Sequence, residues 1–77
     1  MSNKTAAAER QTVENAALGI VTREAFAAYE AMPRDWPVDI TRLRESWCAQ
    51  LVAQTGISGE RARRAITRAI RRRRGGA

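Results

Sequence analysis

The sequence predicts a small all-α domain of three to four helices that ends in a basic helix, and three observations support this class. Alanine is very frequent, and glutamate, glutamine, arginine and leucine, which also favour helices, supply much of the rest. No stretch alternates apolar and polar residues for long enough to predict a strand. A chain of 77 residues has room for one such domain, and it is too short for an enzyme with a deep, water-free pocket.

The first helix is expected over residues 9–21, after a flexible or weakly helical N-terminus over residues 1–8. Its apolar residues Val13, Ala17 and Ile20 recur at helical spacing and form a thin stripe. A stripe this thin needs a partner surface to form a stable helix. We therefore expect this segment to be the interface of a homodimer.

A second helix is expected from Arg23 to Met32. Thr22 precedes it, and its hydroxyl can accept a backbone N–H of the first turn, which is the role of an N-cap. Pro33 ends the helix, because the residue before a proline avoids the α region. Whether this helix is continuous with the first one stays open at this point.

A connector with two prolines leads to the third helix. Trp36 in this connector is expected to pack its ring onto the core, and Asp39 or Thr41 is expected to cap the helix. The helix runs to about Gln54, and Gly56 suits the left-handed conformation that ends many helices. The apolar face of this helix comprises Ile40, Leu43, Trp47 and Leu51.

The last helix begins after Ser58, which is its expected N-cap. An apolar seam recurs along it at helical spacing, and arginines occupy most of the remaining faces, so this helix is amphipathic. The seam comprises Ala62, Ala65, Ile66, Ala69 and Ile70. The single helical domain is expected over residues 9–74, with a flexible tail over residues 75–77.

The net charge of +6 is concentrated near the C-terminus. Residues 1–57 contain six basic and seven acidic residues, whereas residues 58–77 contain eight arginines and one glutamate. A cationic block of this kind predicts a nucleic-acid partner rather than a merely solvated surface. Arginine also suits this role better than lysine, because its planar, forked guanidinium matches phosphate and guanine.

The stretch LVAQTGISGERARRAI, within residues 51–70, resembles the helix-turn-helix of small bacterial and phage DNA-binding regulators. An apolar helix, a turn with Gly56, an apolar Ile57 and the capping Ser58 follow one another as in that motif. The resemblance implies a helix-turn-helix over residues 41–72, with the second helix in the major groove of double-stranded DNA. It implies a sequence-specific DNA-binding protein, a small transcriptional regulator of a phage, plasmid or other mobile element.

The resemblance also assigns roles to residues of the last helix. Its DNA-facing positions, which we expect to contact bases, are Ser58, Gly59, Glu60, Arg63, Arg64 and Thr67. Arg63 and Arg64 are the best candidates for reading guanine, since one guanidinium can bond its O6 and N7 together. Glu60 also has a simpler explanation, because an anion in the first turn complements the helix dipole. The other arginines are expected to contact phosphates: Arg61, Arg68, Arg71, Arg72, Arg73 and Arg74.

Two other functions remain open. The segment RARRAITRAIRRRR resembles the arginine-rich motifs of viral and phage RNA-binding peptides, and this resemblance implies RNA as the partner. Ile66 and Ile70 argue against RNA, because they give the helix an apolar seam that packs on a protein core. The other alternative is a small phage-type inhibitor or adaptor that offers its basic helix to a host protein.

Composition argues against catalysis and against membrane insertion. The chain has no histidine, which removes the usual general base and most metal sites, so we expect no catalytic residue, metal or cofactor. No run reaches the roughly 18 apolar residues of a membrane helix. Cys48 is the single cysteine, so no intramolecular disulfide can form. A reducing, cytoplasmic location at the nucleoid is the expectation.

Overall fold

Outside its turns, the described part of the chain is helical. The computed structural model describes residues 2–33, 35 and 37–75, and the side chains of residues 8–33, 35 and 40–75. Its four helices are α1 (Ser2–Ile20), α2 (Arg23–Ala31), α3 (Pro37–Thr55) and α4 (Gly59–Arg74). No strand occurs in these residues, which confirms the predicted all-α class.

α1 and α2 are separate helices. α1 begins at Ser2, well before the predicted start at residue 9, and ends at Ile20. Thr22 then has an extended backbone, with φ −68° and ψ 168°, and its hydroxyl oxygen accepts the Ala25 backbone N–H over 3.1 Å. The predicted N-cap is confirmed, and the extended Thr22 is what separates the two helices.

α3 begins earlier than predicted. The expected cap at Asp39 or Thr41 is wrong, because α3 begins at Pro37 and both residues lie inside the helix. Proline is favoured at the first helical position, where its fixed φ suits the helix and its missing N–H would have no partner. At the other end, Gly56 has φ 74°, the left-handed conformation that was predicted. The predicted packing of Trp36 lies outside the described residues.

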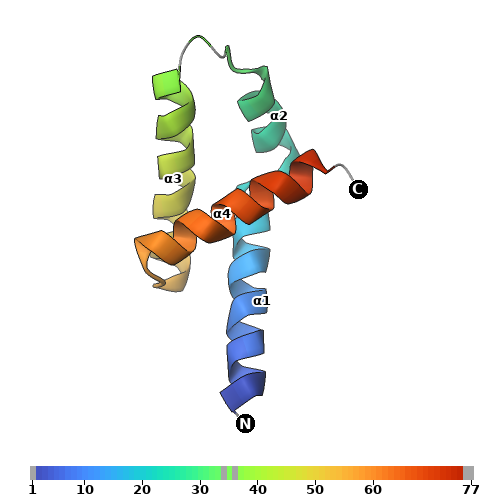
Figure 1. The fold of residues 1–77 in the computed structure, drawn as a ribbon, viewed down its shortest axis with the longest axis vertical. Coiled ribbons are helices and arrows are strands. Elements are labelled where there is room, and N and C mark those ends of the chain that lie inside the picture. The colour runs from blue at the N-terminus through green and yellow to red at the C-terminus, as the bar shows by residue number, and fades with distance from the viewer. Residues whose placement is uncertain (1, 34, 36, 76–77) are drawn as a thin grey trace.

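α4 crosses the other helices (Figure 1). It packs against α1 and α3, which also pack against each other, and its C-terminal end reaches α2. The fold is flat, with Cα extents of 48 × 27 × 14 Å, and the N-terminal half of α1 extends beyond the crossing (Figure 1). One face of α4 is therefore packed, and the opposite face belongs to the surface.

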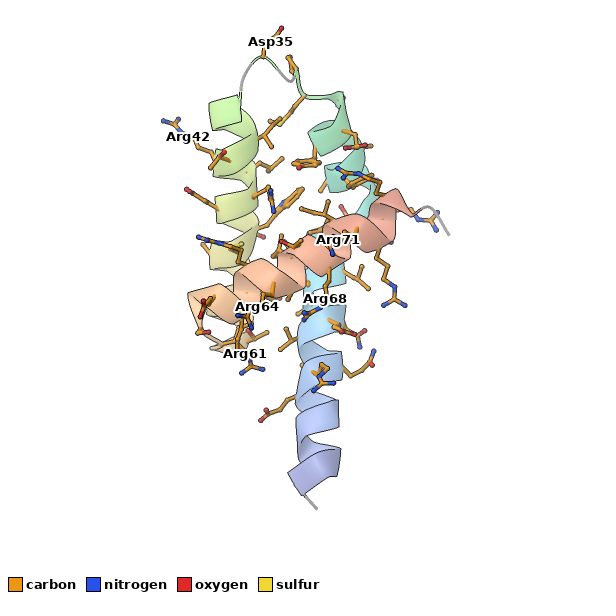
Figure 2. All side chains as sticks on the ribbon, viewed as in Figure 1. Asp35, Arg42, Arg61, Arg64, Arg68 and Arg71 are labelled. Atoms are coloured by element: carbon orange, nitrogen blue, oxygen red, sulfur yellow. The ribbon has the colours of Figure 1, made fainter. Side chains whose placement is uncertain are left out.

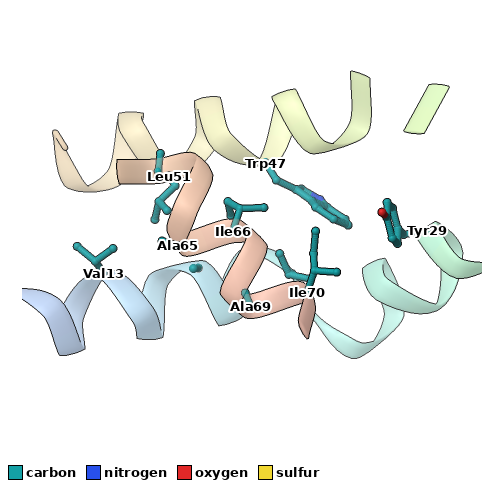
Figure 3. Packing of buried hydrophobic residues seen from close by; sticks show 11 residues of the cluster. Val13, Tyr29, Trp47, Leu51, Ala65, Ile66, Ala69 and Ile70 are labelled. Carbon is teal, nitrogen blue, oxygen red and sulfur yellow. The ribbon is translucent and has the colours of Figure 1, made fainter. Parts of the chain in front are cut away.

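The core lies where α4 meets the other helices (Figure 3). Ile66 and Ile70 of α4 occupy its centre, and the ring of Trp47 lies against Tyr29 with 5.6 Å between the ring centroids. Three alanines of α4 bring its backbone close to its neighbours, because they add little bulk. The buried apolar residues are Val13, Ala17, Val21, Tyr29, Trp47, Leu51, Ala62, Ala65, Ile66, Ala69 and Ile70. The predicted seam of the last helix is thereby confirmed.

The apolar stripe of α1 belongs to this same core. Val13 is 8% exposed and Ala17 is 1% exposed, and Ile20 packs partly buried against them. The partner surface that the thin stripe requires is therefore α4 and α3 of the same chain. The homodimer stays a prediction, but this stripe is no longer a reason for it.

Candidate nucleic-acid interface

The exposed face of α4 carries a row of arginines. The helix starts where the Ser58 hydroxyl oxygen accepts the Arg61 backbone N–H over 3.2 Å, so the predicted N-cap is confirmed. From this start, positions three or four residues apart share one face of the helix. Figure 2 shows the result, four arginine side chains along the side of α4 that faces away from the core. We call this row the arginine stripe; it comprises Arg61, Arg64, Arg68 and Arg71.

The arginine stripe is exposed and largely free of internal partners. Arg68 lies near Glu14, with 3.9 Å between Nε and Oε1. Among the described residues, no hydrogen bond or ion pair engages the other three side chains of the stripe. The helical rise places Arg61 and Arg71 about 15 Å apart along the axis. A row of cations of this length creates a positive electrostatic potential along this side of α4, because most of the charges have no partner among the described residues.

The predicted base contacts do not share one face. Arg64 belongs to the arginine stripe, and Glu60 precedes it by one turn. Arg63 instead lines a groove of about 640 Å³ between α3 and α4, together with Arg44. Thr67 also faces α3, because its hydroxyl donates to the Arg63 carbonyl over 2.8 Å and accepts from Arg44 Nη2 over 3.3 Å. Neighbouring helical residues point about 100° apart, so Arg63 and Arg64 are not a matched pair of readers.

Three of the predicted base contacts are exposed at the start of α4: the N-cap Ser58 and the first two helical residues, Gly59 and Glu60. Ser58 has a structural role as the N-cap, which needs no DNA. Glu60 lies in the first turn, where an anion complements the helix dipole. Gly59 has no atom within 4 Å of the place where a Cβ would lie, so another molecule can approach the backbone closely here.

Two of the predicted phosphate contacts have partners inside the domain. Arg73 is half-buried, and its Nε and Nη2 donate to the carbonyls of Val21 and Leu18 over 2.9 and 3.1 Å. These bonds connect α4 to the C-terminal end of α1, and the phosphate contact of Arg73 stays a prediction. Arg74 Nη2 pairs with Glu30 Oε2 over 3.1 Å at the surface. The predicted phosphate contacts that remain exposed without such a close partner are Arg61, Arg68, Arg71 and Arg72.

Two arginines for which the sequence predicted no role lie beside α4. Arg44 of α3 donates to Thr67, and Arg10 of α1 lines a surface hollow together with arginines of the stripe. The sequence does contain a signal for Arg10, since it lies three residues before Val13 and therefore on the same face of α1. That signal can be interpreted only when the structure shows that α4 packs against α1 beside Val13.

Cys48 lies in the groove between α3 and α4 and is half-buried. Burial raises the pKa of its thiol, whereas the nearby Arg63 and Arg44 act to lower it and Glu45 acts to raise it further. The net effect is a raised pKa, so the thiol is protonated at neutral pH, and a protonated thiol is a poor nucleophile. Within the described residues, no cluster of three or more histidine, cysteine or acidic side chains could hold a metal ion.

No protein-family model, curated protein or solved structure matches this chain. The fold and the site define it as a small all-α protein with a cationic helix face. In the described part of the chain, no helix combines the length and the apolar character that are needed to cross a membrane.

Proposed function

We propose that this protein binds double-stranded DNA, with the exposed face of α4 in the major groove. The observation that carries this proposal is the arginine stripe, four exposed cations in a row on a helix whose opposite face is buried. A charged surface of this kind attracts the phosphate backbone, which dominates the affinity of DNA-binding proteins. The buried seam supports the proposal further, because it presents the stripe on a fixed helix rather than on a loose tail.

The dimensions of α4 support insertion into the major groove. The groove is about 12 Å wide and admits an α-helix. α4 lies across the outside of the domain, and its stripe lies on the exposed side of the helix, along the flank that borders α1 (Figures 1 and 2). The turn formed by residues 56–58 and the cap at Ser58 also agree with the helix-turn-helix resemblance of this segment.

We extend the proposal to a sequence-specific regulator of a phage or other mobile element, which acts by occupying an operator. In this scheme Arg64 contacts guanine, because it lies in the stripe close to the start of α4. The remaining exposed arginines of α4 contact phosphates, which fix the orientation of the protein without reading sequence. Arg63 is left out of the base contacts, because it lines the groove between α3 and α4.

RNA is less well supported as the partner. In the RNA alternative the arginines of α4 would act as a set, so several sides of the helix would have to be accessible. Here the seam of α4 is only 0–5% exposed, and this face packs against the domain. The face left for a nucleic acid carries the arginine stripe, which suits the open major groove of duplex DNA.

The test compares two double variants that remove the same charge. Arg61→Ala with Arg64→Ala removes half of the arginine stripe, and Arg23→Ala with Arg42→Ala removes two exposed arginines outside α4. We expect the stripe variant to lose roughly 100-fold in affinity for a selected duplex. The control variant should lose less than about fivefold, because charges far from the contact are screened. Fluorescence anisotropy at one stated salt concentration measures both.

The same titration includes a random duplex, the duplex selected from a library, and a hairpin RNA. Tighter binding to the hairpin than to every selected duplex would favour the RNA alternative. Equal losses in the two double variants would contradict binding through α4. If no nucleic acid binds, the adaptor alternative takes its place, and its partner would have an acidic surface that faces the stripe.

A further inference from the structure

A crevice between α1 and α4 gathers four arginines. Arg10 of α1 and three members of the arginine stripe line a surface hollow of about 220 Å³, with Val13 as its apolar wall. The helical register explains the position of Arg10, which lies on the same face of α1 as Val13 but one turn further towards the N-terminus. Val13 is covered and Arg10 is exposed, so the guanidinium of Arg10 sits at the edge of the crossing. The stripe arginines of this α1–α4 crevice are Arg61, Arg64 and Arg68.

The charges in the α1–α4 crevice are not balanced within the described residues. Glu14 lies 3.9 Å from Arg68, a long contact between a half-buried carboxylate and an exposed guanidinium. Arg10, Arg61 and Arg64 have no hydrogen bond or ion pair there. Like charges around one hollow disfavour each other, and an anion between them relieves this repulsion. A phosphate group suits the position, because its oxygens accept the forked donors of several guanidinium groups.

We propose that the α1–α4 crevice binds one phosphate group of the DNA backbone, with Arg10 as its contact from α1. The inference rests on the proposed function and adds a second helix to the interface. It also specifies on which flank of α4 the DNA lies, because the duplex then extends over the side of α4 that borders α1. The α3 side differs in character, since Arg44 is engaged there with Thr67 and Cys48 and Ile66 line the groove.

The experiment compares Arg10→Ala with Arg42→Ala. Both side chains are exposed, neither has an ion pair among the described residues, and each substitution removes one positive charge. Figure 2 shows Arg42 on α3, away from the arginine stripe. For a random duplex, Arg10→Ala should weaken binding about three- to tenfold and reduce the slope of log affinity against log salt by about 0.9. Arg42→Ala should change the affinity less than about twofold and leave the slope unchanged.

A third variant and a folding control complete the design. Arg10→Lys keeps the charge but loses the forked donors, so it should restore the slope and only part of the affinity. All variants should unfold thermally at the wild-type temperature, because exposed side chains without partners contribute little stability. If the protein binds duplex DNA and the slope of log affinity against log salt is the same for Arg10→Ala and Arg42→Ala, the proposed phosphate contact in the crevice is wrong. The proposed function is then unaffected.

If the wild-type protein does not bind duplex DNA, the proposed function fails and inorganic pyrophosphate tests the crevice separately. The readout is the Nε–Hε resonances of the arginines in an NMR titration. Concerted shifts of Arg10, Arg61 and Arg64 in the wild type, with the shifts of Arg61 and Arg64 lost in Arg10→Ala, would support a phosphate site independent of DNA. Shifts that are equally small for all arginines, or that persist in Arg10→Ala, would overturn it.

Discussion

Arg72 and Arg73 are adjacent in the sequence and have different surroundings. Arg73 is half-buried and donates to two carbonyls at the end of α1, whereas Arg72 is exposed. The last carbonyls of a helix lack intrahelical partners and carry the negative end of its dipole, so a cation there satisfies both needs. Arg73 therefore connects the end of α1 to the end of α4, which are far apart in the chain.

Replacing Arg73 should reduce stability, and replacing Arg72 should not. We expect Arg73→Ala to lower the free energy of unfolding by about 1–2 kcal/mol, because two charge-assisted hydrogen bonds are lost. Arg72→Ala should stay within about 0.5 kcal/mol of the wild type. Urea denaturation followed by circular dichroism measures both. A loss of the same size in the two variants would mean that the bonds of Arg73 contribute no net stability.

At the scale of elements, the turn between α3 and α4 decides where the arginine stripe points. Gly56 adopts φ 74°, and its N–H donates to the Val52 carbonyl over 2.8 Å, which ends α3. Ser58 then caps α4 only two residues later. Because the turn is this short, the backbone angle at Gly56 determines the direction in which α4 leaves α3 and crosses α1.

Two glycine substitutions distinguish the effect of backbone strain at this turn from the effect of steric crowding. No atom lies within 4 Å of a Cβ built at Gly56 or at Gly59, so neither alanine would clash. Gly56→Ala should lower the free energy of unfolding by about 1–2 kcal/mol, because alanine is strained at positive φ. Gly59→Ala should be neutral or slightly stabilising, since alanine favours helices. Thermal unfolding of both variants tests this, and similar melting temperatures would contradict the argument.

The elements that the sequence predicted correctly depend on local chemistry. Thr22 and Ser58 were identified as caps because a cap needs only its own first turn, and the α4 seam was identified from helical spacing. The start of α3 was missed, because several capping residues compete near Pro37 and local rules do not rank them. The crossing of α4 over α1 was also beyond local rules, since it depends on contacts between distant segments.

In the candidate site too, the sequence predicted local features but not contacts between distant segments. The helix-turn-helix resemblance assigned Arg64 to a DNA-facing position, and the structure places its side chain on the exposed side of α4. Arg63 was paired with Arg64 although it faces α3, because the sequence does not say which flank of α4 is covered. The internal bonds of Arg73 and the position of Arg10 beside α4 were not predicted for a related reason. Both depend on contacts between α1 and α4, which are remote in the chain.

On the scale of the whole molecule, the charge of the basic segment is divided between contacts inside the domain and the exposed surface. Residues 58–77 contain eight arginines, but Arg73 and Arg74 have partners within the domain and Arg63 lines the groove beside α3. The arginine stripe and Arg72 remain for a ligand, and Arg10 joins them from α1. The eight arginines of residues 58–77 therefore overstate the number of cations that this segment offers to a ligand, which is five.

The number of phosphate contacts can be measured from the salt dependence of DNA binding. Arg10, Arg61, Arg68, Arg71 and Arg72 would give five phosphate contacts, so log affinity for a random duplex should fall against log salt with a slope of roughly −4.5. If Arg73 and Arg74 also left their partners for the DNA, the slope would approach roughly −6. Titrations between low and physiological salt at constant pH distinguish the two values. Because the chain has no histidine, we expect the slope to be the same at pH 6 and pH 8. A slope near −6 that falls by about 0.9 in Arg73→Ala would mean that binding DNA releases Arg73 from the end of α1, and that the domain rearranges when it binds.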